Sequence, residues 1–201
     1  METVTAIKKL GDFRVPCYGV LTDYTCIPFL AETELDGYFI AHEALRSELV
    51  EKGIPSERIF VTGIPVDEKF AHHMEKSAAR SYLAMAQEQD VFLIMSGGIG
   101  VGNADAICDE ILRRHGGAFT VYILVGRNSD LKAALEEKYA GNDHVRIVTF
   151  TKKVNVYMNA ADVMISKPGG LTSTEAAVAQ VPLVQLLVYT ACEAPNIAFF
   201  S

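Results

Sequence analysis

Short apolar runs alternate with amphipathic segments along almost the whole chain, and each repeat of this pattern predicts a strand followed by a helix. Several runs are apolar without polar alternation, as expected for parallel strands that helices bury on both faces. The predicted strands are Tyr18–Thr22, Gly37–Ala41, Arg58–Thr62, Val91–Ser96, Phe119–Val125, Val145–Thr149, Asp162–Ser166 and Pro182–Leu187. We therefore expect an α/β protein.

Amphipathic segments between these runs predict helices. The clearest candidates are Glu43–Lys52, Ala104–Arg114 and Thr172–Gln180. In the first, Leu45, Leu49 and Val50 fall on one face of a helix. The last is rich in alanine, which suits close packing on a sheet.

The strand–helix pattern breaks at residues 63–66, where a Gly-Ile-Pro-Val sequence precedes a polar stretch. Three predicted strands lie before this break and five lie after it, which indicates two domains, residues 1–66 and 67–201, each with part of a doubly wound sheet. The first domain has few strands, and Pro195–Ser201 reads as the beginning of a helix. We expect the first domain to be incomplete and the second to lack its C-terminal end.

The net negative charge of the chain argues against some classes of function. A formal net charge of −7 argues against a broad basic surface that would hold a nucleic-acid backbone. No apolar run approaches the ~20 residues needed to cross a bilayer, and the first residues lack the apolar stretch of a secretory signal. We expect a cytoplasmic protein without a nucleic-acid partner.

The histidines and cysteines do not have the spacing of a metal site. His72 and His73 are adjacent, His42 is isolated, and no carboxylate or cysteine lies at a helical ligand spacing from them. The four cysteines are scattered without close pairs. We expect no metal site and no cofactor.

A glycine-rich segment follows the predicted strand Val91–Ser96 and leads into a helix. A strand, glycines and a helix in this order can offer backbone N–H groups to a phosphate. A dinucleotide fingerprint needs glycines at relative positions one, three and six, and counting from Gly98 and Gly100 the third falls on Asn103. The segment is therefore either a phosphate or substrate contact or a tight turn.

A second loop, Lys167–Thr172 (KPGGLT), follows the predicted strand at 162–166. A helix beginning near Thr172 would direct its positive dipole end at this loop, and such an end suits a diphosphate. Glu175 would then either complete a capping box with Thr172 or accept hydrogen bonds from a ribose diol. The spacing alone leaves both readings open.

Asp23 lies within Thr22-Asp23-Tyr24, at the carboxyl end of an early predicted strand. Open α/β sheets build their sites at this end of the strands. Asp23 could be a general base or a substrate ligand, and it could equally cap a turn.

Three segments of the chain carry a family resemblance: residues 20–29 (VLTDYTCIPF), 39–66 (FIAHEALRSELVEKGIPSERIFVTGIPV) and 165–184 (ISKPGGLTSTEAAVAQVPLV). They resemble the bacterial processive diacylglycerol glucosyltransferases and the plant-type monogalactosyldiacylglycerol synthases, with the peptidoglycan N-acetylglucosaminyl transferase as a more distant relative. The resemblance covers nearly the whole chain. It implies a GT-B architecture, in which an acceptor-binding domain faces a second domain that binds a UDP-sugar.

The resemblance also implies roles for individual residues. The loop Lys167–Thr172 would lie against the diphosphate, Glu175 would bind the ribose hydroxyls, and backbone groups at Phe150 would hold the uracil. The glycines at 97, 98 and 100 match the loop that faces the donor. Glu193 and Asn196 match an acidic and an amide position near the sugar. The implied donor-binding residues are thus Gly97, Gly98, Gly100, Phe150, Lys167, Pro168, Gly169, Gly170, Leu171, Thr172, Glu175, Glu193 and Asn196.

The implied reaction is the transfer of a hexose from a UDP-sugar to a lipid hydroxyl of the diacylglycerol type, with inversion and without a metal. We expect the family's base to lie before the first residue of this chain, and Asp23 is the candidate within it. The expected partners are a UDP-sugar and a lipid acceptor, with peripheral contact at the inner face of the membrane. Two alternatives are a nucleotide-sugar-binding fragment without turnover and a sugar-nucleotide epimerase of the same architecture.

Overall fold

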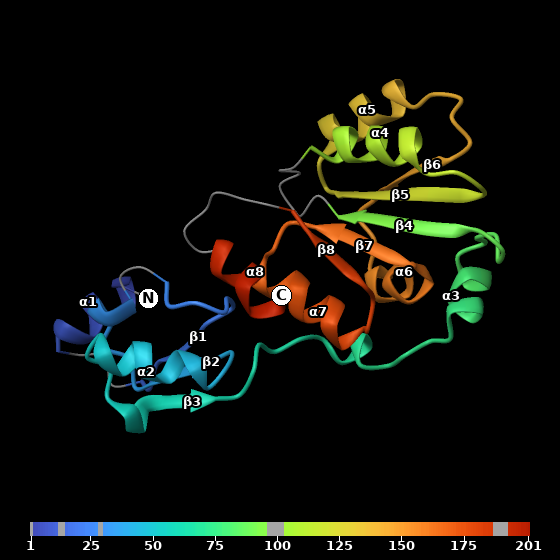
Figure 1. Ribbon diagram of the computed structural model, residues 1–201. Helices are drawn as coiled ribbons and strands as arrows, with labels where there is room; N and C mark the ends of the chain where they lie inside the picture. Colours follow the sequence, from blue (N-terminus) through green and yellow to red (C-terminus); the bar gives the residue numbers. More distant parts are fainter. Residues whose placement is uncertain (1, 12–14, 28–29, 96–102, 187–192) are drawn as a thin grey trace. The chain divides into compact units, whose positions relative to one another are not determined.

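The computed structural model describes residues 2–11, 15–27, 30–95, 103–186 and 193–201 (Figure 1). Its strands are β1 (Tyr18–Val20), β2 (Gly37–Ile40), β3 (Ile59–Val61), β4 (Asp90–Met95), β5 (Phe119–Gly126), β6 (Val145–Thr149), β7 (Val163–Ser166) and β8 (Leu183–Gln185). Its α-helices are α1 (Glu2–Lys9), α2 (Ala44–Glu51), α3 (Lys76–Tyr82), α4 (Ala104–Arg114), α5 (Ser129–Lys138), α6 (Val154–Ala160), α7 (Gly170–Val178) and α8 (Ala194–Phe200). Short 3-10 turns cover Leu30–Glu32, Ser56–Arg58 and Glu68–Phe70.

The chain divides into two compact units. The first unit comprises Met1–Val66, Pro168–Leu171 and Val188–Ser201, and the second comprises Asp67–Lys167 and Thr172–Leu187. The chain passes from the first to the second between Val66 and Asp67. Two later segments return to the first unit, so neither unit is one continuous stretch of sequence.

The first unit contains a parallel three-stranded sheet in the order β1-β2-β3. Its core is apolar and includes Leu21, Ile40 and Leu49, each at most 1% exposed. Tyr38 is also buried, and its hydroxyl donates a hydrogen bond to the Thr33 carbonyl at 2.7 Å. The one polar atom of this large core side chain is therefore satisfied.

The second unit contains a parallel five-stranded sheet in the order β6-β5-β4-β7-β8. The chain runs outward from β4 to β6 and then crosses back to β7. Right-handed crossovers accordingly place α4 and α5 on one face and α6 and α7 on the other, as Figure 1 shows. The strand order reverses between β4 and β7, and ligands of open α/β sheets bind beyond the carboxyl ends of the strands at such a point.

The eight predicted strands are all present, and the predicted helix Ala104–Arg114 has the same bounds in the structure. The predicted α/β class is therefore confirmed. The helix expected to begin near Thr172 begins instead at Gly170. Gly170 and Leu171 adopt helical geometry directly after the turn at Pro168 and Gly169, because the first residues of a helix need no intrahelical partner for their N–H groups.

An ion pair ties α3 to the amino ends of the strands in the second unit. Arg80, only 5% exposed, donates through Nη2 to Asp162 Oδ2 at 2.6 Å. Asp162 also accepts from Lys76 Nζ at 2.8 Å and from the Val91 N–H at 2.7 Å. Burial acts to raise the pKa of Asp162, but these hydrogen bonds and the Arg80 charge hold that pKa below its ordinary value.

We predict that Asp162→Ala lowers the free energy of unfolding by about 3 kcal/mol, because it leaves the buried Arg80 charge without its carboxylate. Since the pKa of Asp162 is lowered in the folded state, its contribution is present above the unfolded pKa of about 4 and is lost as the pH falls toward the folded value. Urea unfolding at neutral pH and at about pH 3 measures both effects.

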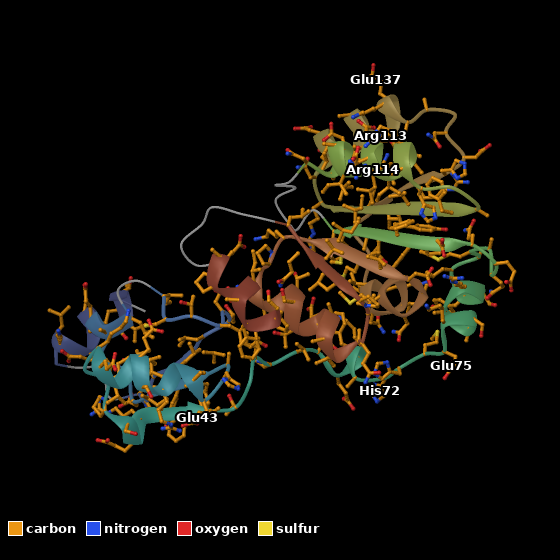
Figure 2. All side chains as sticks on the ribbon, viewed as in Figure 1. Glu43, His72, Glu75, Arg113, Arg114 and Glu137 are labelled. Carbon is orange, nitrogen blue, oxygen red and sulfur yellow. The ribbon has the colours of Figure 1, made fainter. Side chains whose placement is uncertain are left out.

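The matched control for this change is Glu137→Ala. Glu137 points outward from α5 (Figure 2) and is exposed, so this change is expected to alter the unfolding free energy by less than about 0.5 kcal/mol. An Asp162→Ala effect no larger than that of the control would contradict the structural role of the ion pair.

Candidate functional site

Two side chains of the second unit meet where β5 and β6 end. Arg127 follows β5 directly, and Phe150 follows β6. The guanidinium carbon of Arg127 lies 4.6 Å from the centroid of the Phe150 ring, a cation–π distance. The ring remains 53% exposed. The sequence analysis identified Phe150 but not Arg127. The position of Arg127 directly after a buried strand could have indicated it.

Glu175 lies on α7 in the second unit and is partly buried. Thr172 is the third residue of α7 rather than its cap, so the capping-box reading of Glu175 is wrong. Within the described part of the chain, the Glu175 carboxylate forms no hydrogen bond or ion pair. Burial raises its pKa, while Lys69 acts to lower that pKa. A carboxylate in this setting is available to accept hydrogen bonds from a ligand.

Two buried serine hydroxyl groups make hydrogen bonds where β7 leads into α7. Ser173 is fully buried and accepts a hydrogen bond from Gln185 Nε2 of β8 at 2.9 Å. Ser166, at the end of β7, donates to the Met95 carbonyl of β4 at 3.3 Å. The first hydrogen bond attaches α7 to β8, and the second joins the end of β7, from which the chain leads into α7, to β4.

In the first unit, the loop before α7 packs directly on the segment that follows β1. A Cβ atom added to Gly170 would lie 2.0 Å from the Thr22 carbonyl oxygen and 2.9 Å from the Asp23 Cα. Both neighbours are backbone atoms that cannot rotate away. The close approach of these two segments therefore requires glycine at this position.

Asn196 of α8 joins the same two segments from a fully buried position. Its Nδ2 donates to Asp23 Oδ1 and to the Pro168 carbonyl, both at 2.8 Å. Its Oδ1 accepts from the Tyr24 N–H at 2.7 Å. One amide side chain thus holds together the turn after β1, the loop before α7 and α8 itself.

Aromatic contacts add to this attachment of α8. Tyr24 stacks on Phe199 with ring centroids 4.0 Å apart and meets the edge of Phe200 at 4.9 Å. Phe199 also lies against His42, with ring centroids 5.0 Å apart. His42 accepts a hydrogen bond at Nδ1 from the Ala44 N–H, at the start of α2.

The structure brings some of the predicted site residues together. Asp23, Pro168, Gly170 and Asn196 are neighbours in the first unit, which also contains Gly169, Leu171 and Glu193. Phe150, Lys167, Thr172 and Glu175 belong to the second unit. Gly97, Gly98 and Gly100 lie outside the described residues.

The described residues contain no group of three or more His, Cys, Asp or Glu side chains placed to hold a metal ion. None of the helices among those residues has the length and apolar character that a membrane crossing requires.

The sequence of this chain matches two protein-family models and several curated proteins. Residues 2–66 match the model of monogalactosyldiacylglycerol (MGDG) synthase, and residues 103–190 match that of the glycosyltransferase family 28 C-terminal domain. The processive diacylglycerol beta-glucosyltransferase of Staphylococcus saprophyticus is 32% identical over 198 residues, which cover 98% of this chain and 50% of that protein. The chain is similar in sequence to diacylglycerol glycosyltransferases over 98% of its own length. It spans about half the length of the curated relatives it matches.

Solved structures agree on the fold. MurG of Acinetobacter baumannii has a TM-score of 0.61 at 17% identity, over 97% of this chain and 52% of that one. HepE of Anabaena, solved in complex with UDP-glucose, has a TM-score of 0.59 at 17% identity, over 92% of this chain and 57% of that one. At these identities the likeness concerns the fold alone, and it confirms Rossmann-like units of the GT-B type.

We predict that Gly170→Ala lowers the free energy of unfolding by about 2–3 kcal/mol, because its Cβ would overlap the Thr22 carbonyl. Gly116→Ala is the matched control, since a Cβ there meets nothing within 4 Å. We expect that variant to stay within about 0.5 kcal/mol of wild type. Chemical unfolding of the three proteins makes the comparison, and equal stability of the two variants would contradict the close approach.

Proposed function

We propose that this protein transfers a hexose from a UDP-sugar to a lipid hydroxyl of the diacylglycerol type. The observation that carries the proposal is the partly buried Glu175 carboxylate, which lacks a hydrogen-bond partner among the described residues, on a helix that begins within the KPGGLT segment. A ribose diol is a pair of donors that such a carboxylate accepts. The family models that match the chain, and the names of its curated relatives, support a transferase of this substrate class.

Each part of the donor is proposed to meet a particular element. The loop before α7 and the first N–H groups of that helix face the diphosphate, because a helix N-terminus stabilises negative charge. Glu175 binds the ribose, and backbone groups at Phe150 hold the uracil. Arg127 lies beside the Phe150 ring. The glycines at 97, 98 and 100 and Glu193 are further proposed donor contacts. The proposed donor-binding residues are Gly97, Gly98, Gly100, Arg127, Phe150, Lys167, Pro168, Gly169, Gly170, Leu171, Thr172, Glu175 and Glu193.

The proposed reaction is a single displacement. The acceptor oxygen attacks the anomeric carbon from the face opposite UDP, so the configuration inverts. Negative charge grows on the departing diphosphate, and the N-terminus of α7 stabilises that charge more strongly as the bond breaks. Interactions that strengthen in the transition state are the ones that accelerate the chemical step.

The two alternative activities differ from transfer in their products. A binding protein without turnover leaves the UDP-sugar intact, and an epimerase interconverts sugars that remain attached to UDP. Only transfer to an acceptor or to water releases UDP from UDP-glucose. The names of the curated relatives support transfer over both alternatives. The cytoplasmic location and the peripheral membrane contact expected from the sequence form part of the same proposal.

We predict that Glu175→Ala weakens UDP binding about tenfold, which corresponds to about 1.4 kcal/mol. Wild type should also bind UDP more tightly than 2′-deoxy-UDP, and the variant should bind the two alike, because the lost contact is to the ribose hydroxyl. Calorimetric titration measures all four affinities, with Glu137→Ala as the control. Unchanged UDP affinity in Glu175→Ala would overturn the ribose assignment, and no binding by folded wild type would overturn the proposed function.

We predict at most weak membrane attachment for this chain. The basic side chains of α1 are already paired, Lys8 with Asp36 and Lys9 with Glu34, and the net charge of −7 opposes an anionic surface. The exposed Leu10 supplies little apolar area by itself. In flotation with vesicles containing phosphatidylglycerol, most of the protein should stay in the bottom fraction. Recovery of most of it with the vesicles would contradict this expectation.

A further inference from the structure

Arg127 lies in a backbone segment that is fixed on both sides. Gly126, directly before it, has a φ of 60° in the left-handed region, and the pairing of β5 with β6 shifts register between Leu124 and Gly126. The Asn128 N–H donates to the Val125 carbonyl at 3.2 Å and closes a tight turn, and the Asn128 side chain caps α5. Register shifts of this kind redirect a side chain at the end of a strand. The direction of Arg127 is therefore set by the backbone around it.

The guanidinium of Arg127 has a stacking partner but no hydrogen-bond partner in the described part of the chain. Its carbon lies 4.6 Å from the centroid of the Phe150 ring. The side chain is exposed, and its five N–H donors find no carbonyl or carboxylate among the described residues. The buried Arg80 differs, because it donates to Asp162 and to a backbone carbonyl. Arg127 is thus held in place while its donors remain available to a ligand.

Arg127 and Phe150 follow the carboxyl ends of two neighbouring strands, β5 and β6. Ligands of open α/β sheets bind beyond this edge. The proposed function places the uracil against the backbone at Phe150, so a guanidinium over the ring of that residue lies beside the base. Both residues belong to the second unit, and the base would be bound within that unit alone.

A guanidinium distinguishes uracil from cytosine by its hydrogen-bonding chemistry. Uracil presents a carbonyl oxygen at its position 4, where cytosine presents an amino group. Arginine has donors and no acceptor, so it can bond to that oxygen but opposes the amino group with a second donor. Sites built on a hydrogen bond to the ligand reject analogues that cannot make it, because the polar group of the protein is then left unpaired.

We propose that Arg127 determines the specificity of the donor site for uridine, by donating a hydrogen bond from its guanidinium to O4 of the uracil. This inference rests on the proposed function. Gly126 and Phe150 act as positioning residues, since the first directs the arginine and the second supports the guanidinium through the cation–π contact. CDP has the same ribose and diphosphate as UDP, so the contact at O4 separates the two nucleotides.

The first test is calorimetric titration of the full chain with UDP and with CDP. Arg127→Met removes every donor but keeps an unbranched side chain whose sulfur can pack on the Phe150 ring. We expect wild type to bind UDP at least about tenfold more tightly than CDP. In Arg127→Met, the affinity for UDP should fall about tenfold, and the affinity for CDP should change by less than about twofold.

The matched control for this change is Arg113→Met. Arg113 is an exposed arginine of α4 (Figure 2), and it pairs with Glu110 at 2.7 Å on the surface of the protein. This variant should bind UDP and CDP as wild type does. Urea unfolding shows whether each variant is folded before its affinities are compared.

The second test identifies the atom that Arg127 contacts. In 4-thio-UDP a sulfur atom, which is a weaker acceptor, replaces O4 and the rest of the nucleotide is unchanged. Wild type should bind 4-thio-UDP at least about threefold more weakly than UDP. Arg127→Met should bind the two nucleotides alike, because it has no donor for either atom.

The other outcomes are also decisive. Affinities for UDP and CDP that fall by the same factor in Arg127→Met would assign the arginine to the ribose or the diphosphate and overturn the contact with the base. An unchanged UDP affinity in this variant, or a wild type that binds UDP and CDP equally, would overturn it too and leave the proposed donor site intact. Folded wild type that binds neither nucleotide would be a failure of the proposed function itself, and this inference would fall with it.

Discussion

Parallel pairing of apolar strands is the constraint on which the rest of this structure depends. Every strand pair in both sheets is parallel, so each strand needs a crossover and helices cover the faces. Polar chemistry is thereby excluded from the sheet faces and confined to the ends of the strands. Phe150 and Lys167 directly follow β6 and β7, and Asp23 lies three residues after the end of β1.

Close backbone approach is the second determinant of the site. Two segments far apart in sequence, the turn after β1 and the loop before α7, touch at Gly170 with no room for a side chain. The buried Asn196 amide then links both segments to α8. Gly170 allows the two backbone segments to touch, and the Asn196 amide fixes the direction of the Asp23 carboxylate. The loop before α7 and this carboxylate are therefore held together.

The carboxylates of this protein fall into two physical classes. Asp162 is surrounded by donors, and its interactions are all made within the protein, which makes it a structural group. Glu175 and Asp23 each retain at least one oxygen without a hydrogen-bond partner among the described residues. A carboxylate held near the carboxyl ends of parallel strands with unused acceptor capacity contributes little to stability, and it is the kind of group that a substrate satisfies.

Much of the fold followed from the sequence, because hydrophobic periodicity and strand length are local properties. The eight strands, the two sets of three and five, and the helix Ala104–Arg114 were all predictable in this way, and the KPGGLT loop with Glu175 indicated a family through its local pattern. Local pattern could not show that Thr172 lies inside α7, that Arg127 lies over Phe150, or that Asn196 is buried against Asp23. Those facts depend on which segments meet after folding. Residues 23 and 196 are far apart in the chain, and their hydrogen bond does not affect the hydrophobic pattern of either segment. Only the tertiary structure decided this pairing.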